Sequence, residues 1–148
     1  FLVLWFWARD SRNFDFPFFA INPADFWKRF HISLGAWFSD YIFKPLYKLM
    51  LKRKILNRHR LLTQNICLLM TFLAMGLWNG FQWNYVLSGF LFGMYSVIHN
   101  SYLSISKKFD WDFFHLLPKP ISIGVKRVLM FHAAGLAIYA FNGKFPTI

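Results

Sequence analysis

The five histidines are the first residues to consider for chemistry, because imidazole is the side chain that exchanges a proton most readily near neutral pH. They are His31, His59, His99, His115 and His132. No two of them have the spacing that places a pair of metal ligands on one helix face. The single cysteine, Cys67, lies in an apolar run and adds no ligand cluster. The sequence therefore predicts no metal site and leaves the histidines as candidates for acid–base chemistry.

His31 has the most distinctive surroundings of the five. It lies in FWKRFHISLGAWFSDYIF, residues 26–43, where aromatic, basic and hydroxyl side chains are mixed. This setting suits a general base, but it also fits a capped interfacial helix whose histidine bonds a backbone group. His132 lies in an apolar run, where an ionisable group is either functional or a neutral buried histidine. The other three are expected in a basic cluster, at the end of a span and in a loop: His59, His99 and His115.

The composition indicates the environment in which these residues act. The chain has 148 residues, of which 57% are hydrophobic, 22% aromatic and 16% charged. Soluble domains carry about 25% charged residues, so this composition is typical of an integral membrane protein. Seventeen Lys and Arg against six acids, all of them Asp, give a net charge of +11. Because the aromatic residues lie mostly in apolar runs, we predict no nucleic-acid partner.

The helix that must carry His31 has a clear predicted start. Asn22 suits the capping position, Pro23 the first helical position and Asp25 the first turn. We expect this helix to run on through His31, with the aromatic residues on one face. Residues 22–52 are predicted as a block of motif and interfacial helices.

Three apolar runs are predicted as transmembrane spans. They are residues 61–78, 84–103 and 126–141. Residues 1–7 look like the end of a preceding span, and residues 104–127 are predicted as a loop. Gly89 and Gly93 have the GxxxG spacing that lets another helix approach closely. The predicted fold class is all-α: a polytopic integral membrane helical bundle, present as a fragment with about three spans plus interfacial or re-entrant helices.

A basic cluster precedes the first of these spans. It consists of Lys44, Lys48, Lys52, Arg53, Lys54, Arg58 and Arg60. The first three lie four residues apart, on one stripe of a helix expected in the membrane interface. A hairpin of the first two spans places the cluster and Lys107/Lys108 on one side, which the positive-inside rule makes cytoplasmic. The cluster is suited to lipid headgroups or to an acidic partner.

Two motifs resemble the membrane-bound O-acyltransferase family. They are DFWKRFHISLGAWFSDYIFKPL at residues 25–46 and MGLWNGFQWNYVLSGFLFG at residues 75–93. Within the family, the chain is most similar to the branch that transfers D-alanine to teichoic acids. Alginate O-acetylases usually carry a Gly-Gly-Asn-Arg-like turn where this chain has residues 47–50. The resemblance implies that residues 1–148 are the C-terminal part of one such domain, in a polytopic bundle with a central funnel.

The resemblance also implies a donor and partners. In this branch the acyl donor is a phosphopantetheine thioester on an acidic carrier protein, and no cofactor is bound to the transferase itself. The carrier approaches from the cytoplasm, where the basic cluster would attract it. The chain is then expected in the cell membrane with several spans, in contact with lipids and with other subunits of envelope modification.

One position departs from the family pattern. Where the family has Trp-His-Gly, with a presumed catalytic histidine, this chain has Trp78-Asn79-Gly80. His31 matches the family's other motif histidine and is carried over as catalytic. Asn79 cannot accept a proton, although its NH₂ group could donate to an oxyanion. Either His31 is the base, or the chain is a silent relative that docks a carrier protein or subunits. An alginate-type polysaccharide O-acetyltransferase is the alternative within the enzyme class.

Overall fold

The computed structural model describes residues 13–53, 59–110 and 112–143, and this part of the chain is helical. In chain order the elements are η1 (Pro17–Phe19), α2 (Pro23–Trp27), α3 (Ile32–Phe38), the π-helix η2 (Ser39–Phe43), α4 (Lys44–Lys52), α5 (Arg60–Asn79), α6 (Trp83–Phe109), η3 (Phe113–Leu116) and α7 (Lys119–Phe141). The prediction of an all-α fold is confirmed for these residues. The span end expected at residues 1–7, and Lys54 and Arg58 of the basic cluster, lie outside them.

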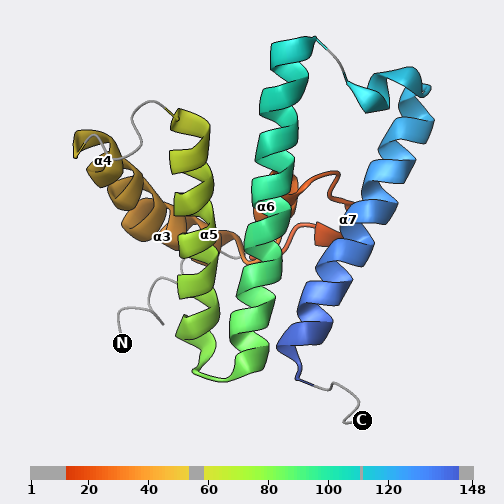
Figure 1. The fold of residues 1–148 in the computed structure, drawn as a ribbon. Helices are drawn as coiled ribbons and strands as arrows, with labels where there is room; N and C mark the ends of the chain where they lie inside the picture. The colour runs from red at the N-terminus through yellow and green to blue at the C-terminus, as the bar shows by residue number, and fades with distance from the viewer. Residues whose placement is uncertain (1–12, 54–58, 111, 144–148) are drawn as a thin grey trace.

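Helices α5 and α6 form an antiparallel hairpin at the centre of the structure (Figure 1). Glycines let the two backbones approach closely. A Cβ on Gly76 would lie 2.5 Å from the carbonyl oxygen of Tyr85, and a Cβ on Gly89 would lie 2.5 Å from that of Phe72. Gly93 also faces α5, where a Cβ would lie 3.3 Å from the Cβ of Phe72. The hairpin therefore depends on three glycines, of which Gly76 was not singled out in the sequence.

Helix α7 packs against α6, on the side of the hairpin away from α4 (Figure 1). Its buried face consists mainly of small side chains, namely Ser122, Met130, Ala134, Ala137 and Ala140. At the end of the helix, Nδ2 of Asn84 in α6 donates to the carbonyl oxygen of Phe141 at 2.7 Å. The α5–α6 turn and the C-terminal end of α7 thus lie at the same end of the bundle, here called the turn end.

The loop expected over residues 104–127 is wrong, because helix occupies most of that range. Helix α6 continues to Phe109, since two lysines in its last turn suit the negative end of the helix dipole. Helix α7 begins at Lys119 and has Pro120 in its first turn, where the missing N–H of proline costs no helical bond. The predicted spans ended where charged residues begin. The helices continue beyond them, because long helices can carry charged residues in their end turns.

Two helices, α5 and α7, are long and apolar enough to cross a membrane by length and composition. Helix α5 extends one residue beyond each end of the predicted range 61–78, and α7 begins before the predicted range 126–141. The predicted span 84–103 lies inside α6, whose 27 residues measure about 40 Å. Helix α6 is less apolar and does not meet the same criterion.

The N-terminal segment, residues 13–38, packs across the hairpin. Its helix α2 begins as predicted: the Asn22 side chain accepts a hydrogen bond from the backbone N–H of Asp25 at 2.8 Å. Phe26 and Phe38 are almost completely buried and share one core with side chains of α5 and α6. Contacts between aromatic rings hold this segment against the helices. The Phe26 ring, for example, stacks on the Phe92 ring of α6 with 5.6 Å between their centres.

Candidate active site

His31 lies at a break between α2 and α3, so the predicted continuous helix through this residue is wrong. Its φ of 52° and ψ of 51° are in the left-handed region, which costs a non-glycine residue roughly 1–2 kcal/mol. Bonds to a distant part of the chain hold it there: Ile32 N–H donates to the Asn13 carbonyl at 3.1 Å. The backbone N–H and the hydroxyl of Ser33 also donate to the Asn13 side-chain oxygen, at 3.2 and 2.6 Å.

An ion pair supports the chain just before His31. Arg29 Nε donates to the carboxylate of Asp25 at 2.9 Å, and the same carboxylate accepts from the backbone N–H of Ile21 at 3.1 Å. Burial acts to raise the pKa of Asp25. The bond from Arg29, the bond from Ile21 and the nearby positive charges outweigh burial and hold this pKa below its ordinary value. The carboxylate therefore stays ionised and keeps the helix start in place.

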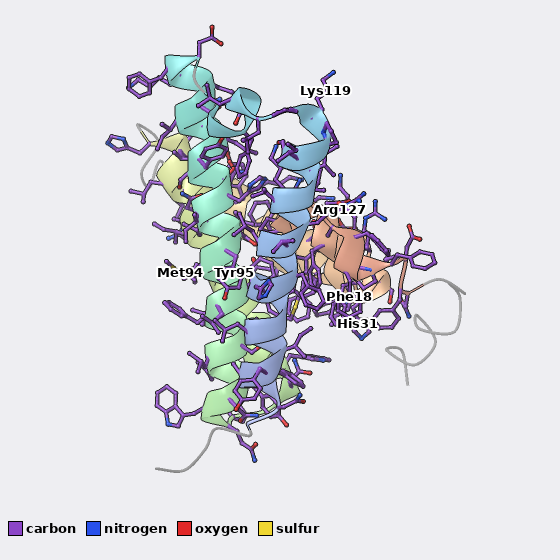
Figure 2. All side chains as sticks on the ribbon, turned by 90° about the vertical axis from the view of Figure 1, so that its right-hand side faces the viewer. Phe18, His31, Met94, Tyr95, Lys119 and Arg127 are labelled. Carbon is purple, nitrogen blue, oxygen red and sulfur yellow. The ribbon has the colours of Figure 1, made fainter. Side chains whose placement is uncertain are left out.

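The His31 imidazole is half-buried among aromatic rings. Its ring centre lies 5.4 Å from that of Phe14 and 6.1 Å from that of Phe30. Burial lowers the pKa of His31, so the neutral imidazole predominates at pH 7. Figure 2 places His31 well inside the length of the bundle, away from Lys119 at one end. A neutral imidazole in such a position has the lone pair that a general base needs.

One cavity of about 480 Å³ is lined by both His31 and Asn79. The two residues come from the N-terminal segment and from the end of α5, and the structure brings them to one space. Most of the lining is apolar or aromatic: Trp27, Phe30, Leu34, Phe72, Met75, Trp78, Phe92, Ile138 and Phe141. Tyr85, Ser88 and Asn142 add polar atoms that sequence reasoning missed. The available signal was the polarity of Tyr85 and Ser88 within the apolar run of α6, whereas Asn142 directly follows the last residue of α7. We call this space the central cavity.

Asn79 is exposed at the end of α5 and its amide is partly engaged. Its Nδ2 donates to the carbonyl oxygen of Met75, one turn earlier, at 2.8 Å. A primary amide has two N–H groups, so one remains for a second acceptor. No proton can be accepted at this nitrogen near neutral pH. Of the two residues, Asn79 can therefore only donate a hydrogen bond through its nitrogen, whereas the imidazole of His31 can accept a proton.

A second cavity of about 580 Å³ adjoins the first, because Trp27, Phe72 and Met75 line both. Its other polar lining residues are Lys28, Ser39, Gln64, Thr71, Ser96, His99 and Asn100. Helix α6 continues ten residues past His99, so this histidine lies inside the helix and not at its C-terminal end. We call this space the basic-end cavity, since it reaches toward the end of the bundle where α5 begins and α6 ends.

The basic cluster lies apart from the central cavity. Its members within the described ranges are all exposed: Lys44, Lys48, Lys52, Arg53 and Arg60. Lys44 pairs with Asp40, one turn earlier. Two of the other histidines do not line the central cavity. His59 is exposed before α5, and His132 is exposed on α7 with its Nδ1 2.8 Å from the Val128 carbonyl oxygen.

The described residues contain no cluster of side chains that could hold a metal ion. No three His, Cys, Asp or Glu side chains gather there as metal ligands would. The described site is instead a neutral histidine and an amide in a largely apolar cavity within a helical bundle. Such a site offers one group that can accept a proton and one that can donate a hydrogen bond.

Comparison with known proteins identifies relatives of the chain. The chain is 31% identical over 136 residues to the teichoic acid D-alanyltransferase of Bacillus subtilis, covering 92% of this chain and 33% of that protein. It is 33% identical over 132 residues to the peptidoglycan O-acetyltransferase of Helicobacter pylori, covering 89% of this chain and 22% of that protein. A probable alginate O-acetylase of Pseudomonas fluorescens is 33% identical over 63% of this chain and 17% of its own length.

These relatives are membrane-bound O-acyltransferases, and the chain belongs to this family. No family model matches the sequence. The chain spans about a third of the length of the Bacillus subtilis relative and about a fifth of the Helicobacter pylori one.

Proposed function

We propose that the chain is the C-terminal part of one membrane-bound O-acyltransferase domain. It transfers D-alanine from a carrier-protein thioester toward teichoic acid. The observation that carries the proposal is the convergence of His31 and Asn79 on the central cavity. The identity with teichoic acid D-alanyltransferases supports the choice of acyl group and acceptor.

The site residues have complementary roles in acyl transfer. Neutral His31 takes the proton of the acceptor hydroxyl as its oxygen attacks the thioester carbonyl carbon. The second N–H of Asn79 donates to the oxygen that becomes negative. When the tetrahedral intermediate collapses, the carbon–sulfur bond breaks and the new ester remains. The departing thiolate then receives the proton from the His31 imidazolium, so that the histidine is neutral again.

The donor enters from the basic end in this proposal. The basic-end cavity is large enough for an extended chain, and it shares three lining residues with the central cavity. A phosphopantetheine arm placed there would deliver its thioester next to His31. The exposed basic cluster on α4 and at the start of α5 would attract the acidic carrier protein. Lipid headgroups and other envelope-modification subunits are further partners of this surface.

The same arrangement supports a membrane topology. We propose that α5, α6 and α7 all cross the membrane, as a polytopic bundle whose basic end is cytoplasmic. The start of α5, the end of α6 and the start of α7 lie at one end of the bundle (Figure 1). Arg60, Lys107, Lys108 and Lys119 therefore gather on one side, as the positive-inside rule requires. Cysteine labelling of intact cells at Lys107 and at Gln82 should find them on opposite sides.

The experiment that tests the function uses the full-length protein in lipid nanodiscs with D-alanyl carrier protein as donor. His31→Ala should lower transfer by about 10²–10⁴-fold, the usual effect of losing a general base. His132→Ala is the matched control, because His132 is exposed on α7 and bonds only within its own helix among the described contacts. Full transfer by His31→Ala would overturn the proposal.

The carrier surface has a separate test. Charge reversal at Lys44, Lys48 and Lys52 should weaken carrier binding and remove most of its salt dependence, since exposed charges are screened by salt. Membrane insertion of the variant is measured in parallel. Unchanged carrier binding would mean that the basic cluster binds lipid headgroups and not the carrier protein.

A silent relative that docks a carrier protein is the second candidate, and the observation that favours it is Asn79 in place of the motif histidine. Asn79→His separates the two. A protein that is inactive and gains transfer only with this substitution is a silent relative. The identities with peptidoglycan and alginate O-acetylating relatives make acetyl transfer to a polysaccharide the alternative reaction. Acetyl and D-alanyl donors offered in parallel decide between them.

A further inference from the structure

One buried hydroxyl group in the bundle differs from its neighbours. The hydroxyl of Thr71 donates to the Cys67 carbonyl at 2.7 Å, and that of Ser96 donates to the Phe92 carbonyl at 2.9 Å, each one turn earlier in its own helix. Ser88 in α6 is only 4% exposed, and within the described residues its hydroxyl has no hydrogen-bond partner. A buried polar group without a partner is destabilising, so a ligand that completes its bonding would be favoured there.

Ser88 lines the central cavity. The next residue, Gly89, lies where the backbones of α5 and α6 approach closely, so the chain is held firmly at this point. Tyr85 and Phe92 lie one turn before and one turn after Ser88 on the same side of α6, and both also line the cavity. The unpaired hydroxyl therefore has a fixed place in the cavity wall, between two aromatic residues.

The two candidate acyl groups differ in what they offer to such a hydroxyl. Acetyl and D-alanyl donors present the same thioester carbonyl. Only the D-alanyl group also has an α-amino group, whose N–H can donate to the oxygen of Ser88. An acetyl group has no N–H or O–H and would leave the hydroxyl unpaired. A site that is built to bond an N–H or O–H of its substrate strongly rejects an analogue that lacks this group.

The rest of the cavity wall also suits an amine. Among the described residues that line the central cavity there is no Lys or Arg, so no cationic side chain repels a protonated amine. There is no Asp or Glu either, so no carboxylate replaces Ser88 as the acceptor. Aromatic rings attract a cation to their faces, and the rings of Tyr85 and Phe92 lie on the same side of α6 as the hydroxyl.

We infer that Ser88 selects the acyl group: its hydroxyl oxygen accepts a hydrogen bond from the α-amino group of the D-alanyl donor, and the site thereby favours an aminoacyl over an acetyl group. This inference rests on the proposed function and adds the residue that recognises the acyl group. The thioester carbonyl then lies toward Asn79 and the acceptor hydroxyl toward His31. The three polar side chains therefore have separate tasks.

Other roles of Ser88 would have a different experimental signature. A hydroxyl that donated to the thioester oxygen, or one that bonded the acceptor, would act equally on every acyl donor, because all donors share that carbonyl and that acceptor. Only a bond to the amine makes the effect of Ser88 depend on the acyl group. The propionyl group has the carbon skeleton of D-alanyl without the amine. The ratio between D-alanyl and propionyl donors is therefore the decisive quantity.

The test uses the full-length protein in nanodiscs and carrier protein loaded with stable amide analogues of the D-alanyl and propionyl donors, which bind but are not transferred. The unsubstituted protein should bind the D-alanyl analogue about tenfold more tightly, the effect of one hydrogen bond to a charged group. Ser88→Ala should remove this preference. Ser122→Ala is the matched control and should keep it, because Ser122 is also a buried serine but does not line the cavity.

Transfer from thioester donors gives the second readout. Ser88→Ala should lower kcat/KM for the D-alanyl donor about tenfold and leave that for the propionyl donor unchanged. Binding of neither analogue, equal affinity of the unsubstituted protein for both, an unchanged ratio in Ser88→Ala, or equal losses for both donors would each overturn the inference. A protein that prefers the D-alanyl analogue but transfers no acyl group would overturn the proposed function alone.

Discussion

His31 and Asn79 line the same cavity, but the chain holds them in place by different means. His31 is fixed by polar bonds from a distant segment, with Asn13 bonded to Ile32 and Ser33, and its backbone is in an unfavourable conformation. Asn79 ends a regular helix whose position depends on backbone contacts at Gly76 and Gly89. A defect in the first region should displace the His31 imidazole, whereas a defect in the second should separate the helices that form the cavity.

The largest effect on stability is expected from the glycine contact. Gly89→Ala places a Cβ 2.5 Å from the Phe72 carbonyl oxygen. Because a backbone atom cannot move aside as the end of a side chain can, this overpacking should cost about 3 kcal/mol of unfolding free energy, the upper end of the usual range. Gly124→Ala in α7 is the control, because nothing lies within 4 Å of the new Cβ and alanine favours helix by about 1 kcal/mol. Thermal unfolding in detergent measures both. Equal changes in the two variants would show that the hairpin does not depend on close approach.

A smaller and more local effect is expected from the bonds that hold His31. Asn13→Ala removes the acceptor of the buried Ser33 hydroxyl, which costs about 1–3 kcal/mol. Transfer should fall about tenfold through kcat as the base loses its position. Asn13→Asp keeps the acceptor oxygen and should retain most of the rate. Normal kcat in Asn13→Ala would mean that the aromatic contacts alone hold the imidazole.

The smallest effect is a shift in pH dependence. Burial lowers the pKa of His31 below the ordinary value of 6.5, so the neutral form persists to lower pH than in a free histidine. Transfer should therefore persist to lower pH than an ordinary histidine would allow and decline as pH falls through the lowered pKa of His31. The stability contributed by neutral His31 is lost over the same acidic range. A kcat/KM profile whose acidic limb lies at or above pH 6.5 would contradict this environment.

Local patterns allowed several elements to be predicted from particular residues. The cap at Asn22, the long helix of α5 and the face of α6 that carries Gly89 and Gly93 follow from spacing within one segment. The break at His31 could not be predicted in this way. Its cause is a bond to Asn13, which the periodicity of residues 22–34 does not contain. The start of α7 at Lys119 was not predicted, because the predicted range included only the apolar residues and the two basic residues directly before them.

The sequence by itself determined that the chain is helical, that its composition suits a membrane and that the segment around His31 resembles a motif of the family, because composition, periodicity and motifs are local properties. Only the tertiary structure decided which residues share a cavity. His31, Asn79, Tyr85 and Asn142 come from four separate parts of the chain and meet in one space. The physical reason is that long-range packing sets their distances. Here it acts through the glycine contact of α5 with α6, the Asn13 bonds and the bond from Asn84 to α7.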